Sequence, residues 1–92
     1  SRKTKKQSYL QSRVDRNMNL YNRYRQLLEL GPSQGQGKEA TYRAPKGMFV
    51  GGMIIKRKEL EARMTQLLDA MARDNTEMAN QGMEPDFLDT DL

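Results

Sequence analysis

The placement of glycine and proline constrains this fold more than any other feature of the sequence. Residues 1–30 contain neither, whereas six of the seven glycines and two of the three prolines lie within 31–52. Both residues destabilise a helix interior. We therefore predict an all-α fold, in which two helices are joined by a Gly-rich flexible connector and flanked by polar extended tails.

The first helix is predicted over about residues 7–30. Capping-box patterns begin at Thr4 and at Ser8, and Leu30-Gly31-Pro32 forms a strong stop because proline cannot continue the helix. Several apolar residues recur at helical spacing and fall on one side of the helix. These residues are Leu10, Val14, Met18, Tyr21 and Leu28.

The second helix is predicted over about residues 53–80, with its start at Met53 or Lys56. Residues 47–55 could form a short strand, a docked apolar loop or the first turn of this helix. Asn80 to Gly82 supplies its stop, and Pro85 follows. Positions 60, 64, 67, 71, 74 and 78 follow a heptad spacing, but this spacing puts Asp74 at a core position, which weakens a coiled-coil interpretation. One apolar stripe is expected to form a protein interface or a core. It comprises Leu60, Met64, Leu67, Met71 and Met78.

The linker at residues 31–52 combines a polar Gly-rich part with an apolar loop. A phosphate-binding loop that ended at Gly37-Lys38 would need a glycine at position 32, where the chain has Pro32. It would also need a magnesium-binding hydroxyl at position 39, where the chain has Glu39. We therefore expect a connector and no nucleotide site. The apolar loop contains Met48, Phe49 and Val50, which we expect to dock in a groove of a partner protein or to cover the helix pair.

Charge divides the chain into two halves of opposite sign, within one small helical unit over residues 1–92. Residues 1–46 carry a net charge of +8, including a basic arm at 1–6, and residues 47–92 carry −4. The acidic tail at 81–92 mixes carboxylates with apolar side chains, a composition typical of segments that fold onto basic, apolar grooves. Its apolar motif is Phe87, Leu88 and Leu92.

A basic surface is predicted along the first helix, covering about one third of its circumference. At 100° per residue, Tyr9, Leu20 and Leu27 lie among its cations, with Tyr24 at the edge. Arginine beside aromatic rings suits phosphate contact and base stacking. Pairing with an acidic protein surface, the acidic tail included, is the alternative. The predicted contacts are Lys5, Lys6, Arg13, Arg16 and Arg23.

The composition argues against catalysis. The chain has no histidine and no cysteine, so imidazole and thiolate chemistry are excluded. We expect no enzyme activity, no cofactor, no metal site and no small-molecule substrate. The longest apolar run, at 47–55, is too short for a membrane span. We expect a protein that is not secreted and that works inside the cell or within an assembled particle, with the cytoplasm the favoured compartment.

These observations favour a non-enzymatic interaction or assembly protein that bridges or stabilises components of a larger complex. Its partner would be a larger protein assembly or a second copy of the chain. A nucleic-acid-binding protein that uses the basic first helix is one alternative. A small inhibitor or regulator that docks on one enzyme is another. Steep salt dependence of binding would distinguish nucleic-acid contact, because neutralised phosphates release counterions.

Overall fold

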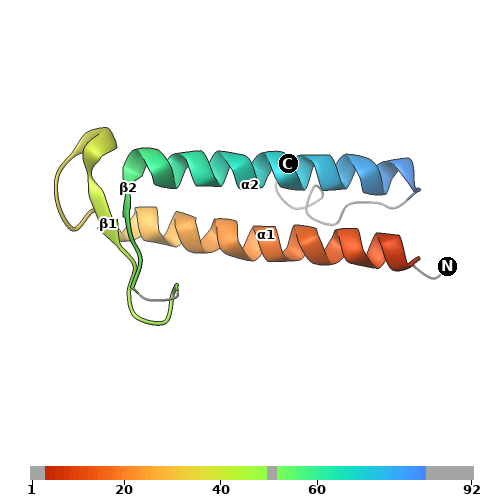
Figure 1. Ribbon diagram of the computed structural model, residues 1–92, viewed down its shortest axis with the longest axis horizontal. Helices are drawn as coiled ribbons and strands as arrows, with labels where there is room; N and C mark the ends of the chain where they lie inside the picture. The colour runs from red at the N-terminus through yellow and green to blue at the C-terminus, as the bar shows by residue number, and fades with distance from the viewer. Residues whose placement is uncertain (1–3, 50–51, 83–92) are drawn as a thin grey trace.

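The computed structural model describes residues 4–49 and 52–82. Two long helices, α1 (Lys5–Leu30) and α2 (Arg57–Asn80), lie side by side and antiparallel, with a small sheet across one end (Figure 1). The prediction of a mostly helical chain with two joined helices is confirmed, but the all-α class is only approximate because of this sheet. Val50 and the tail motif Phe87, Leu88 and Leu92 lie outside the described residues.

The bounds of α1 follow from its caps. The Thr4 hydroxyl accepts a hydrogen bond from the Gln7 amide at 3.1 Å, and the Gln7 side chain accepts one from the Thr4 amide at 2.9 Å. This complete capping box starts the helix two residues before the predicted position. Lys5 and Lys6 therefore belong to the first turn and not to an extended arm. The helix ends at Leu30, because Gly31 adopts a φ of 86°.

The linker contains regular structure that the sequence analysis did not assign. A short 3₁₀ helix, η1 (Gly37–Glu39), precedes strand β1 (Thr41–Arg43), which pairs antiparallel with β2 (Ile54–Lys56). The backbone of residues 33 and 34 also bonds to Thr41, so this part is more than a bare connector. Residues 54–56 were predicted to be helical, and that prediction was wrong. Their β-branched isoleucines suit a strand with one buried face.

The second helix starts where the strand pairing stops. The amide of Arg57 donates to the carbonyl of Ala40 at 2.8 Å, so the linker caps the first turn of α2. At the other end, the Gln81 amide bonds back to the carbonyls of Glu77 and Met78, and Gly82 follows with a φ of 76°. The C-terminal end of α2 at Asn80 therefore agrees with the predicted end of the second helix.

The hydrophobic core has two parts. At the sheet end, Tyr42 and Ile55 are register partners, and their buried side chains pack on the ends of both helices. Half-buried Phe49 stacks on Tyr24, with ring centroids 5.0 Å apart. Along the helix pair, a second cluster is buried between α1 and α2. Its buried members are Leu10, Val14, Met71 and Met78.

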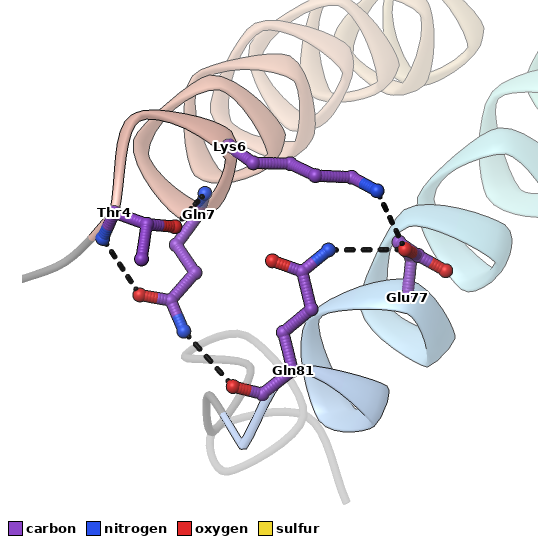
Figure 2. A network of polar contacts seen from close by, with 5 residues as sticks. All are labelled: Thr4, Lys6, Gln7, Glu77 and Gln81. Carbon is purple, nitrogen blue, oxygen red and sulfur yellow. Dashed lines mark hydrogen bonds and ion pairs between the residues drawn. The ribbon is translucent and has the colours of Figure 1, made fainter.

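Polar contacts close the hairpin at the end opposite the sheet. Gln7 donates from Nε2 to the carbonyl of Gln81 at 3.0 Å, and Lys6 Nζ lies 3.1 Å from Glu77 Oε1 (Figure 2). The Gln81 side chain donates to the same Glu77 oxygen at 3.0 Å. These hydrogen bonds from Gln81 and Lys6 lower the pKa of Glu77. The first turn of α1 thus holds the last turn of α2, which fixes where the chain leaves the hairpin.

Candidate functional site

A depression of about 540 Å³ runs along one face of α1. It joins two exposed arginines, Arg16 and Arg23, to a half-buried apolar side chain, Leu20. The exposed ring of Tyr9 marks its end nearest the N-terminus of the helix. Among the described residues, its lining is Tyr9, Arg13, Arg16, Asn17, Asn19, Leu20 and Arg23.

A second depression, of about 330 Å³, lies between α1 and α2 and shares Asn17 and Leu20 with the first. Its α2 wall supplies a cation, Arg63, and apolar surface from half-buried Leu67. We name the two adjoining depressions the side groove. The second part is lined by Asn17, Leu20, Tyr24, Arg63, Gln66, Leu67 and Ala70.

Two arginines of the side groove are held by hydrogen bonds and ion pairs. Arg63 donates to the Tyr24 hydroxyl at 3.1 Å, which raises the pKa of Arg63, and its other nitrogen pairs with Glu59 at 3.0 Å. Arg13 lies over the ring of Tyr9, 5.5 Å from its centroid, and 3.1 Å from Oδ2 of Asp74. Each guanidinium therefore contacts one residue of α1 and one residue of α2.

The five cations predicted for the basic surface fall into two groups. Lys6 and Arg13 form ion pairs with α2, through Glu77 and Asp74. The other three form no ion pair within residues 4–49 and 52–82, and their side chains are exposed. Two of these three line the side groove and the third lies in the first turn of α1. They are Arg16, Arg23 and Lys5.

Part of the predicted basic surface is in fact core. Leu27 is fully buried and Tyr24 is 5% exposed, because the sheet folds over this end of α1 and covers it. The helical periodicity placed both residues on the solvent side, since it assumed a connector that covers nothing. The predicted surface therefore ends near Arg23.

Several lining residues were missed by the sequence analysis, namely Asn17, Asn19, Arg63, Gln66 and Ala70. Asn17 and Asn19 lie on α1 itself, beside the predicted cations. Arg63, Gln66 and Ala70 lie on α2 and become neighbours of the basic surface only because α2 is antiparallel to α1. Matching the two apolar stripes, so that Leu27 lies near Leu60 and Leu10 near Met78, would have identified Arg63 as a neighbour of Tyr24. Leu10 and Met78 belong to the predicted stripes but Leu27 does not, so only part of this alignment could be predicted from the sequence.

The helix interface contains a buried polar layer next to the groove. Asp74 is 6% exposed and its counterion is Arg13, whose side chain reaches it from the surface. Asn75 is 4% exposed, and neither its Nδ2 nor its Oδ1 has a hydrogen-bond partner among the described residues. Such a group reduces stability by leaving hydrogen-bonding capacity unused.

The other residues singled out from the sequence lie on the core. Leu60, Met71 and Met78 are fully buried, and Met64 and Leu67 are half-buried. Met48 and Phe49 of the apolar loop are half-buried against the sheet-end cluster of the same chain. Within one chain these side chains therefore pack largely on each other, and Leu67 also faces the side groove.

Chemically, the side groove offers cations, amides and apolar surface, but no arrangement of a nucleophile with a base. No group of three His, Cys, Asp or Glu side chains in the described part of the chain is placed to hold a metal ion. Neither α1 nor α2 is long and apolar enough to cross a bilayer. Comparison of the chain with protein-family models, curated proteins and solved structures found no match.

Proposed function

We propose that this chain is a non-enzymatic binding protein that contributes to the assembly of a larger complex. It does so by holding an acidic segment of a partner protein, with interspersed apolar residues, in the side groove. One observation carries the proposal: two adjoining depressions that share Asn17 and Leu20 bring arginines and apolar surface from both helices together.

The chemistry of the lining suits such a segment. Arg16 and Arg23 present planar guanidinium groups, which pair with carboxylates through two parallel hydrogen bonds. Leu20 and Leu67 offer apolar contact between the cations. The side-chain amides of Asn17 and Gln66 can both donate and accept, as an extended peptide backbone requires.

Two observations favour a protein segment over a polyphosphate. Lys6 and Arg13 already have carboxylate partners on α2, so they contribute less positive potential to an incoming polyanion. In addition, the α2 wall of the second part carries apolar surface from Leu67 and Ala70 beside Arg63, and that apolar surface offers nothing to a phosphate backbone. The apolar wall is used only when the ligand also carries apolar side chains.

The proposal is tested with a labelled ten-residue peptide of alternating Asp and Leu, and a matched peptide of alternating Asn and Leu. Fluorescence anisotropy is measured for the wild type and for Arg16→Gln/Arg23→Gln. At up to about 1 kcal/mol for each exposed pair and 1.4 kcal/mol per tenfold, the double variant should bind the acidic peptide about tenfold more weakly.

The matched control is Arg25→Gln/Arg43→Gln, which removes two exposed arginines that do not line the groove. Its affinity should stay within about twofold of the wild type, at equal helix content by circular dichroism. Equal weakening in both double variants would show a general charge effect and would contradict the proposal. Equal binding of the Asp and Asn peptides by the wild type would contradict it as well.

Nucleic-acid binding is the second candidate, favoured by one observation. Tyr9 is 57% exposed beside Arg13 and Arg16, an arrangement that suits stacking of an unpaired base with phosphate contact. A labelled single-stranded oligonucleotide is titrated from low to physiological salt. Arg16→Ala should lower the salt slope by about one. A Kd weaker than about 10⁻⁴ M at physiological salt would be no better than non-specific binding and would exclude this candidate.

A further inference from the structure

The chain leaves α2 at one end of the side groove. The carbonyl of Gln81 accepts a hydrogen bond from Gln7 in the first turn of α1, so Gln81 lies beside the start of that helix (Figure 2). The groove begins two residues further along α1, at Tyr9. Residues 83–92 lie outside the described part of the chain, and the point at which they are attached is therefore next to the Tyr9 end of the groove.

The composition of residues 83–92 matches the groove. The segment carries four carboxylates and no lysine or arginine. Among the described residues the groove is lined by four arginines, of which Arg16 and Arg23 form no ion pair there. The apolar side chains of the segment include Phe87, Leu88 and Leu92, which correspond to the apolar lining at Leu20 and Leu67. Charge and apolar content are thus complementary within a single chain.

The segment is also long enough. Ten extended residues span roughly 33 Å, whereas the axial distance from Gln7 to Arg23 along α1 is about 24 Å at 1.5 Å per residue. The segment can therefore follow the groove over its whole length without any change in the helix pair.

We propose that residues 83–92 occupy the side groove of their own chain and compete with the partner for it. This inference rests on the proposed function, since it assumes that the groove accepts acidic segments. A tethered segment experiences an effective concentration on the order of 1 mM. If its intrinsic Kd is about 0.1 mM, the groove is about 90% occupied, and an external ligand binds about tenfold more weakly.

The first test neutralises the segment in the full chain with Asp86→Asn/Asp89→Asn/Asp91→Asn. Its control neutralises three exposed acids that do not line the groove, with Asp15→Asn/Glu29→Gln/Asp69→Asn. The Asp-Leu peptide should bind the segment variant about tenfold more tightly than the control or the wild type. Equal affinity for all three proteins would overturn self-occupancy while leaving the proposed function intact. Absence of binding to all three would refute both.

The second test locates the segment directly. The chain has no cysteine, so Thr90→Cys takes a single nitroxide spin label. Amide signals of Asn19 and Arg23 should broaden, and that of Glu77, which lies beside the first turn of α1, should broaden less. Unbroadened groove amides would overturn the proposal. Broadening of an unlabelled ¹⁵N chain mixed with a labelled ¹⁴N chain would overturn it too, by showing exchange between copies.

Discussion

Leu27 provides the sharpest test of how the linker packs. Helical periodicity places it on the basic surface of α1, but the structure buries it completely among Tyr42, Ile55 and Leu60. Replacement of a fully buried leucine by alanine costs about 2–5 kcal/mol, from lost transfer free energy and the cavity left behind. A domain of this size has a total stability of roughly 5–14 kcal/mol, so Leu27→Ala removes a large share of it.

The assay is thermal and urea unfolding, followed by circular dichroism. Each kcal/mol shifts the Tm of a domain of 60–100 residues by about 4–8 °C, so a loss of about 2 kcal/mol lowers the Tm by roughly 8–16 °C. The control is Leu30→Ala, which removes a leucine that is 61% exposed on the same helix. It should change stability by less than about 0.5 kcal/mol. If Leu27→Ala and Leu30→Ala melt within about 2 °C of each other, the sheet does not cover α1 as described.

Three further predictions concern polar groups. Asn75→Leu should raise the free energy of unfolding by about 1 kcal/mol, because the buried amide has no partner among the described residues; urea unfolding with a lower midpoint would refute this. Arg13→Met should lower the Tm by leaving Asp74 without its counterion, and adding Asp74→Leu should restore it; a double variant no more stable than Arg13→Met would count against the ion pair. Hydrogen bonds and charge from two lysines, Lys56 first, lower the pKa of Glu39 from 4.5 to about 2. The contribution of the Glu39 carboxylate to the free energy of unfolding is therefore complete above pH 4.5 and is lost as the pH falls toward 2. Over that pH interval the Tm of Glu39→Gln should fall less than the Tm of the wild type.

The two helices were predictable because their signals are local. Capping boxes, the glycine stop at Gly31 and the stripe through Leu60 and Met71 each depend on residues within a few turns. The two-stranded sheet was not predictable in the same way. Strands of three residues carry little periodicity, and the pairing of Tyr42 with Ile55 joins positions on either side of the apolar loop.

The candidate site was predictable only in part, for the same reason. Arg16, Arg23 and Leu20 share one face of α1, and the sequence places them together by helical geometry alone. The α2 wall depends on how the two helices align, which is set by long-range contacts such as that between Arg63 and Tyr24. Burial of Leu27 likewise depends on the linker returning across the end of the helix pair.

The most direct measurement for the central claim is an amide chemical-shift titration of the ¹⁵N-labelled chain with the Asp-Leu peptide. The Asp86→Asn/Asp89→Asn/Asp91→Asn variant is used, so that competition from the chain's own acidic segment is reduced. The account predicts shifts confined to the two walls of the side groove, around Leu20 on α1 and Ala70 on α2. Shifts centred on η1 and β1 at the sheet end, or no shifts at saturating peptide, would contradict it.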